Sequence, residues 1–344
     1  MDTHDRIVDE LLAELRLIGN RPDLRPVHAT GIGLTGSFLA SPTARTYCTA
    51  EHFSGRRAVP VSVRFSNGSG SAREHDGRSD VRGMATRFHL EGGAATDLIA
   101  MTLPMFFTPT PETFLEFLDT ARPTPVRATS AWRKILDFLQ LVQPMADPYP
   151  DQRRSPAPGA IQYADTHASA QLAVLQAATI GAPVSYARAA YHAVHAFAIT
   201  DPDGDRRWVR FSWRPVAGAR NTDPAKPPMD KYLADELCTR LAREPARFTL
   251  VMAIGEAGDD PTDPSRPWPP NRQRVVLGEL TLDEIPSNQL VHCENLSFNP
   301  LLLASGIGPS DDPVLLVRGK AYSKSSAWRR GTPCPFDRCS PNGK

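Results

Sequence analysis

The sequence predicts an α+β fold with an antiparallel β-barrel at its core and helices packed around it. Strand-like segments occur in two groups, one before and one after a block of helical segments. Strands and helices therefore do not alternate in the way that a parallel sheet requires. The strand-like segments are also short, amphipathic and numerous. An open sheet would leave their edges exposed, so we expect the sheet to close.

The first elements of the chain are a helix and a group of strands. Residues 1–20 form an amphipathic helix that ends at Gly19-Asn20, and their acidic residues differ from the basic start of a signal peptide. Alternating apolar residues followed by turn residues predict strands at 58–70, 83–93 and 96–107.

Helices and a second group of strands make up the rest. Apolar residues three and four positions apart predict helices at 112–122, 130–143 and 164–181. Strands return at 192–200, 205–218 and 246–255, and an Asp-Gly turn joins the first two as a hairpin. The remaining segments are a helix near 229–243, an apolar-rich stretch at 274–286, and an element at 311–330 that is apolar and then basic.

The composition fits a globular protein with a sizeable core. Of the 344 residues, 41% are hydrophobic and 22% are charged, and the formal net charge is +1. This balance gives no reason to expect nucleic acid as a partner, and the absence of a run of about 18 apolar residues argues against a membrane span. We expect one cytoplasmic domain over residues 1–344, with a flexible tail at 331–344.

Local motifs do not identify the chemistry. The five cysteines match no structural zinc site, and Cys334 and Cys339 could pair under oxidation, although we expect free thiols in a reducing cytoplasm. The run GIGLTGSF lacks the helix and the later acidic residue of a nucleotide-binding loop, and H-E-x-x-H and G-x-S-x-G do not occur. Read locally, His28 in RPVHATGIG is either a buried polar side chain or a catalytic one.

Two long stretches together resemble a known family. The first runs from RPVHATGIG at 25–33 through VRFSNGSG, DVRGMATRFHL and TDLIAMTLPMFF, and the second is FNPLLLASGIGPSDDPVLLVRGKAY at 298–322. In this order and spacing they resemble the heme catalase family, in particular its shortened members, the catalase-related peroxidases. The resemblance covers roughly residues 20–330. It implies heme b as the cofactor, the family's antiparallel β-barrel, and no C-terminal helical domain.

The resemblance assigns the axial iron ligand to Tyr322, which closes the motif R-x-x-x-Y that begins at Arg318. Ligation to ferric iron needs the phenolate, and a nearby guanidinium favours this charged form. Arg318 can share a face with Tyr322 if the segment is helical. An anionic oxygen ligand stabilises ferric and higher-valent iron, which suits peroxide chemistry. The resemblance also places His195 behind Arg318.

On the distal side of the heme, the resemblance assigns proton transfer to His28 and the orientation of His28 to Ser66. Imidazole can take a proton from one peroxide oxygen and deliver it to the other, because it gains and loses protons readily near neutral pH. The alternative for Ser66 is an ordinary hydroxyl at the end of a strand.

Other residues match positions around the heme. Guanidinium groups suit carboxylates, and the family's propionate-binding positions fall at Arg25, Arg64 and Arg329. The sequence WRR leaves Arg330 as an alternative to Arg329. Val27 and Phe114 match apolar residues on the distal heme face, although packing in an ordinary core would explain them equally well.

One distal position departs from the family. Catalases have an asparagine where DLIAMTLPMFF places Met101, and a thioether donates no hydrogen bond. Thr102 could substitute only if the backbone shifts. The short chain also implies an open pocket and a monomer or homodimer. We therefore expect a peroxidase that reduces hydrogen peroxide or organic hydroperoxides with organic electron donors and has weak catalase activity.

Two other functions stay open on this evidence. A fatty-acid hydroperoxide isomerase of the allene oxide synthase type uses the same axial tyrosine and distal histidine without an external electron donor. A non-catalytic heme-binding or sensing protein would keep the fold, but it would have no need of a proton-transferring His28.

Overall fold

The computed structural model describes residues 3–19, 24–55, 57–120, 158–223, 225–226 and 228–329. The helix predicted at 130–143 and the tail predicted at 331–344, with Cys334 and Cys339, lie outside these residues. The other predicted elements fall wholly or largely within them.

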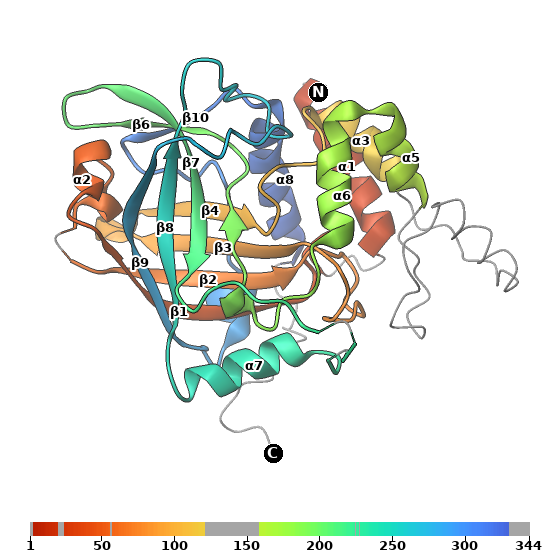
Figure 1. Ribbon diagram of the computed structural model, residues 1–344, viewed down its shortest axis with the longest axis horizontal. Coiled ribbons are helices and arrows are strands. Elements are labelled where there is room, and N and C mark those ends of the chain that lie inside the picture. The colour runs from red at the N-terminus through yellow and green to blue at the C-terminus, as the bar shows by residue number, and fades with distance from the viewer. Residues whose placement is uncertain are drawn as a thin grey trace, which may run out of the picture.

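Antiparallel strands form a closed barrel, as predicted (Figure 1). The order around the barrel is β7, β5, β4, β3, β2, β1, β9 and β8, and pairing of β8 with β7 closes it. Two further strands, β6 and β10, extend from β7. The bounds are β1 Gly31–Ala40, β2 Val59–Asn67, β3 Arg82–His89, β4 Ala95–Met101, β5 Tyr191–His192, β6 Phe197–Thr200, β7 Arg206–Pro215, β8 Ala246–Ile254, β9 Arg274–Glu284 and β10 Ile307–Pro309.

Large apolar side chains fill the barrel interior, because successive strand residues point to opposite faces of the sheet. Strand β8 shows the alternation clearly, with every second residue buried from the start of the strand: Ala246, Phe248, Leu250 and Met252. Across the interior, Phe38 of β1 packs edge-on against Trp213 of β7. The predicted core is therefore the inside of the barrel.

The longer helices lie in two places around the barrel (Figure 1). Helices α1, α3, α5, α6 and α8 lie together, and α7 lies apart from them. Their bounds are α1 Thr3–Gly19, α3 Pro111–Thr120, α5 Pro158–Thr166, α6 Ala168–Thr179, α7 Tyr232–Leu241 and α8 Pro313–Arg329, and short helical turns occupy Ala44–Tyr47 (α2), Glu51–Phe53, Glu91–Gly93, Tyr186–Arg188 and Leu290–Glu294. The first group shares a second apolar core, the helical cluster: Val8, Leu11, Leu12, Phe117, Leu118, Tyr163, Ala170 and Val317.

Three predicted segments differ in detail from the structure. The strand expected at 192–200 is divided into β5 and β6, and His195, which lies between them, contacts Asp312. The helix expected at 164–181 is interrupted at His167, whose backbone is extended. The glycine-rich run GIGLTGSF lies within strand β1.

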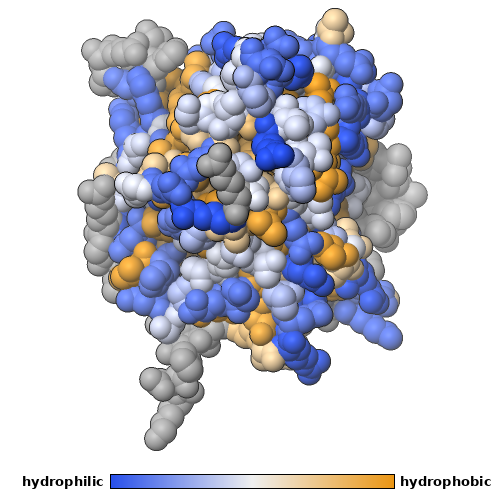
Figure 2. All heavy atoms as spheres, turned by 90° about the vertical axis from the view of Figure 1, so that its left-hand side faces the viewer, coloured by the Kyte–Doolittle hydropathy of each residue, from blue (hydrophilic) through white to orange (hydrophobic). Residues whose placement is uncertain are grey.

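The last features of the fold are the distribution of hydrophobic residues and the state of the buried cysteines. Among the described residues, no helix has both the length and the apolar character needed to cross a bilayer. Figure 2 shows hydrophobic residues in several separate areas of the visible face, among hydrophilic ones. The thiols of Cys48 and Cys293 are buried and belong to no disulfide.

Candidate active site

A cavity with about 790 Å³ of empty space, part of it open to solvent, is lined by residues of the barrel and of helices α1 and α8. Its walls come from residues 25–28, from β2, β3 and β4, from residues 296–298, and from the two helices. The predicted site residues that line it are Arg25, Val27, His28, Arg64, Ser66, Tyr322 and Arg329.

A chain of hydrogen bonds ends on the tyrosine of this cavity. Arg318 and Tyr322 lie one turn apart on α8, and Arg318 Nη2 donates to Tyr322 Oη at 2.8 Å. Arg318 Nη1 contacts His195 Nε2 at 2.7 Å, and His195 Nδ1 lies 2.6 Å from Asp312 Oδ2. Arginine can only donate, so His195 Nε2 accepts and the proton is on Nδ1, which donates to Asp312. The buried Asp312 thus orients His195, and His195 orients the guanidinium that faces Tyr322.

His28 is held as a neutral imidazole. Ser66 Oγ lies 3.0 Å from His28 Nδ1, so Nε2 is the ring nitrogen left for chemistry in the cavity. Burial, together with the positive charges of Arg64 and Arg318, lowers the pKa of His28 to about 3. At neutral pH the ring can therefore accept a proton at Nε2.

The backbone of His28 adopts a left-handed conformation, with φ of 58°. This region is unusual for a residue other than glycine and costs of order 1 kcal/mol or more. The amide of His28 donates to Gly68 O at 3.1 Å, and Arg64 Nη1 donates to His28 O at 3.0 Å. Together with the bond to Ser66, these contacts hold His28 on the amide, carbonyl and ring sides.

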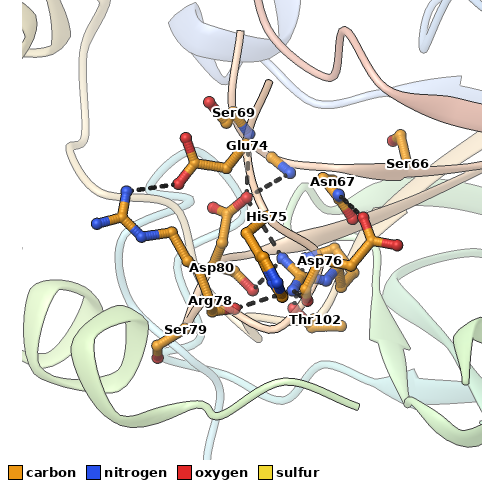
Figure 3. Close-up of polar contacts among 12 residues, drawn as sticks. Ser66, Asn67, Ser69, Glu74, His75, Asp76, Arg78, Ser79, Asp80 and Thr102 are labelled. Carbon is orange, nitrogen blue, oxygen red and sulfur yellow. Dashed lines mark hydrogen bonds and ion pairs between the residues drawn. The ribbon is translucent and has the colours of Figure 1, made fainter. Parts of the chain in front are cut away.

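The segment opposite His28 is itself fixed by a buried polar network, part of which Figure 3 shows. Asp80 Oδ2 accepts from the amides of Gly68 and Ser69 at 2.9 and 3.1 Å. The carbonyls of those same two residues accept from the amides of His28 and Ala29. Asp80 therefore supports the backbone on which His28 depends.

Gly83 of β3 leaves the space that this pair needs. A Cβ atom at Gly83 would lie 2.7 Å from Ser66 Oγ and 2.9 Å from His28 Cε1 and Nδ1. These distances are shorter than real Cβ contacts, so any side chain at position 83 would displace Ser66 or His28.

Three arginines and one carboxylate form a charged wall. Glu294 pairs with Arg25 and with Arg64, the latter at 2.8 Å between Arg64 Nε and Glu294 Oε1. Burial alone would raise the pKa of the Glu294 carboxyl, but the charges of Arg64 and Arg25 outweigh it and bring the pKa to about 2. Burial, with the charges of Arg25 and Arg64, lowers the pKa of Arg329 to about 9. Among the described residues, this wall holds three guanidinium groups and one carboxylate, which is an excess of two positive charges.

Comparison with known proteins identifies the family. The sequence profile of the catalase family matches residues 16–147 and 161–335, which is most of the chain. The chain belongs to the catalase family. The family resemblance inferred from the sequence is thereby confirmed.

Relatives within the catalase family include proteins of similar and of greater length. A catalase-related peroxidase of Mycolicibacterium paratuberculosis is 34% identical over 328 residues, which cover 91% of each chain. A catalase-related peroxidase of Synechococcus elongatus is 29% identical, and the match covers 88% of this chain and 82% of the relative. The catalase of Vibrio cholerae is 26% identical, but only 58% of it is covered. The match is thus nearly end to end with the first two.

Catalases are in general heme-dependent, and the charged wall fits the carboxylates of a heme. Two propionates would balance the excess positive charge of Arg25, Arg64 and Arg329 over Glu294. The Nε of Arg329 is also buried and has no hydrogen-bond partner among the residues that the structure describes. A buried polar atom of this kind is normally satisfied, so an anion near Arg329 would meet an existing requirement.

Phe114 and Met101, which were both compared with the catalase pattern, do not line the cavity. Phe114 on α3 packs instead between Phe106 and Phe117, with ring centroids 4.8 and 6.2 Å away, beside the helical cluster. Met101 ends β4 opposite Gly83 and is half-buried. Thr102, the other candidate for the asparagine's role, does not line the cavity either, and its Oγ1 accepts from the amide of Arg82 at 3.0 Å.

The sequence reasoning missed Glu294, Asp312 and the part of α1 that lines the cavity. Asp312 lies within the quoted stretch GPSDDP, six residues before Arg318, so its place near the arginine was detectable. Glu294 has no comparable signal, because its partners lie more than 200 residues away in the chain.

Proposed function

We propose that this protein is a heme-dependent peroxidase that reduces hydrogen peroxide or organic hydroperoxides with organic electron donors. The observation that carries the proposal is that a single cavity presents both His28, bonded to Ser66, and Tyr322, bonded to Arg318. Two relatives with long matches are named catalase-related peroxidases, which supports the same reaction class.

Heme b is the cofactor that the residues fit. Tyr322 Oη is the iron ligand in this proposal, with the propionates at Arg25, Arg64 and Arg329. When bound, heme supplies an iron that exchanges electrons with peroxide. Arg318 Nη2 donates to Tyr322 Oη at 2.8 Å, and this hydrogen bond orients the oxygen that would bind the iron.

His28 moves the proton. Its neutral Nε2 accepts a proton from one peroxide oxygen and returns it to the other, so that water leaves instead of hydroxide. Ser66 at Nδ1 keeps the ring in the orientation for this transfer. The strained but fully bonded backbone of His28 keeps the ring in place without further rearrangement.

The choice of electron donor follows from the position of Met101. The distal asparagine of catalases is replaced by a residue with no N–H donor, and Thr102 does not line the cavity. A second peroxide molecule, which must act as the reductant in catalase turnover, is therefore held less well. Organic donors become the main reductants, and catalase activity is weak.

The test compares three products from one preparation of heme-loaded protein. Hydrogen peroxide or cumene hydroperoxide is supplied with a phenolic or dye donor, and oxidised donor and evolved oxygen are measured together. We expect donor oxidation to exceed oxygen evolution. Oxygen evolution at the rate of a full-length catalase would contradict the proposal. Conversion of a fatty-acid hydroperoxide to an epoxide without donor consumption would instead identify a hydroperoxide isomerase.

A further inference from the structure

Helix α1 forms part of the cavity wall, although most of this helix lies outside the region that the catalase family profile matches. The family profile begins at residue 16, so nearly all of α1 precedes the match. Leu12 and Leu15 of α1 nevertheless line the same cavity as His28 and Tyr322. Leu12 is only 3% exposed, and Leu15 is partly buried.

Helix α1 is firmly docked beside the helix that carries Tyr322. Lys320 Nζ of α8 lies 3.0 Å from Asp5 Oδ1 of α1, and Lys324 Nζ lies 2.6 Å from Asp9 Oδ1. Both pairs are spaced by four residues on each helix, so α1 and α8 run side by side in the same direction. These exposed pairs contribute little energy, and they serve mainly to fix the register.

The apolar contacts supply most of the docking energy. Val8, Leu11 and Leu12 are buried in the helical cluster, where they meet residues of α3, α5, α6 and α8. On the cavity side, Leu12 and Leu15 face the same space as Ala321 and Ser325 of α8, next to Tyr322 and one turn before Arg329. The leucines therefore add an apolar surface beside the expected iron ligand and the charged wall.

We propose that Leu12 and Leu15 contact the bound heme and retain it, so that α1 is the retaining wall of the cofactor site. This inference rests on the proposed heme dependence. A porphyrin is largely apolar, and burying its surface against two leucines is favourable by the hydrophobic effect. Without α1, this side of the cavity would lose that surface.

The test measures the rate at which heme is lost from the full-length holoprotein to an excess of apomyoglobin, followed by Soret absorbance. Each buried CH₂ group is worth about fourfold in an equilibrium constant. Leu→Ala removes three carbon atoms, so we expect Leu12→Ala and Leu15→Ala each to release heme between about fourfold and about 60-fold faster, according to how many of these carbons contact the heme, whereas Leu12→Met stays near the parent rate. Leu15 is only partly buried, so its variant tests the proposal without threatening the fold.

Leu11→Ala is the matched control. Leu11 is the same residue type on the same helix and is buried in the helical cluster, but it does not line the cavity. Release from the Leu12 and Leu15 variants at the parent rate, or no faster than from Leu11→Ala, would overturn the inference. If the parent protein binds no heme, both the proposed function and the role of α1 are wrong. If the parent protein has a normal Soret band and the substitutions do not change the rate of heme release, only the role of α1 is wrong.

Discussion

At the scale of single residues, the site depends on side chains that are fixed by several partners each. His28 is bonded at its amide, its carbonyl and its ring, which stabilises a backbone conformation that a lone histidine would avoid. Tyr322 has a guanidinium fixed through His195 and Asp312. Preorganisation of this kind lets a small set of side chains act without a cost of rearrangement.

The His28 imidazole is expected to be essential, and the Ser66 hydroxyl supportive. His28→Ala should slow the reaction with peroxide at least 100-fold, because proton transfer contributes about that much, while heme stays bound. Ser66→Ala should cost less, because it leaves the imidazole in place. Stopped-flow absorbance with hydrogen peroxide measures both rates. A His28→Ala variant that reacts at the parent rate would show that the assignment is wrong.

The low pKa of His28 sets the pH dependence of the same step. The base form of His28 persists above its pKa of about 3, and it is lost only as pH falls through that value. The rate of the peroxide reaction should therefore stay level from pH 8 to pH 5, measured after a rapid pH jump so that the fold is intact. A decline centred near pH 6.5, the ordinary histidine value, would contradict this environment for His28.

Glu294 is expected to hold the arginines apart and in place. Glu294→Gln removes the only carboxylate between Arg25 and Arg64 among the described residues while keeping the size of the side chain. The thermal stability of the heme-free protein should fall by a few degrees, because two buried guanidinium groups lose their counter-charge. Bound heme should restore part of this loss, since its propionates would replace the lost charge. Equal losses with and without heme would argue against propionates at this wall.

At the scale of elements, the residue that precedes α8 both stabilises the start of the helix and takes part in the hydrogen bonds of the site. Asp312 precedes the helix, and its Oδ1 accepts from the amides of Val314 and Leu315 at 2.8 and 3.2 Å, as an N-cap does. Its Oδ2 accepts from His195. One carboxylate therefore starts the helix and begins the chain of hydrogen bonds that reaches Tyr322.

Asp312→Ala should accordingly affect both stability and the heme environment. Loss of an N-cap costs about 1 kcal/mol, and His195 would lose its acceptor as well. We expect a lower Tm and a shifted Soret maximum. Asp311→Ala is the control, because Asp311 is adjacent but exposed. An equal shift of the Soret maximum in both variants would show that Asp312 has no specific effect on the heme environment.

The elements themselves were largely predictable from periodicity, and the connections between them were not. The spacing of Arg318 and Tyr322 required a helix, and α8 supplies it. The contact between His195 and Asp312 could not be predicted from neighbouring residues, because the two residues are 117 positions apart in the chain. Phe114 is a case in which the sequence suits two roles equally, contact with the distal heme face and packing in a core. In the structure its ring packs against Phe106 beside the helical cluster.

At the scale of the whole molecule, buried histidines make the folded state sensitive to acid. Burial lowers the pKa of His52 to about 3, and burial with the charges of Arg214 and Arg274 lowers that of His192 to about 4. Below about pH 6.5 the unfolded chain binds protons at these residues, while the folded chain does so only near pH 3 to 4. Unfolding therefore takes up protons, and stability falls as pH falls from 6.5.

Each such histidine should lower the free energy of unfolding by up to about 1.4 kcal/mol per pH unit over this interval. Urea unfolding of the heme-free protein between pH 7 and pH 5 measures the slope. His52→Leu removes one titrating group, so its slope should be smaller than that of the parent. His52 does not line the cavity, so this variant isolates the effect of burial. Identical slopes would show that His52 is not held neutral in the folded state.

The central claim is that Tyr322 lies in a heme site, and one absorption measurement tests it most directly. The purified protein and its Tyr322→Phe variant are each titrated with hemin, and the Soret band is followed to saturation. The structure predicts one heme per chain in the parent protein, with much weaker and spectrally different binding in the variant. A parent protein without a Soret band, or two proteins with the same band and affinity, would contradict the claim.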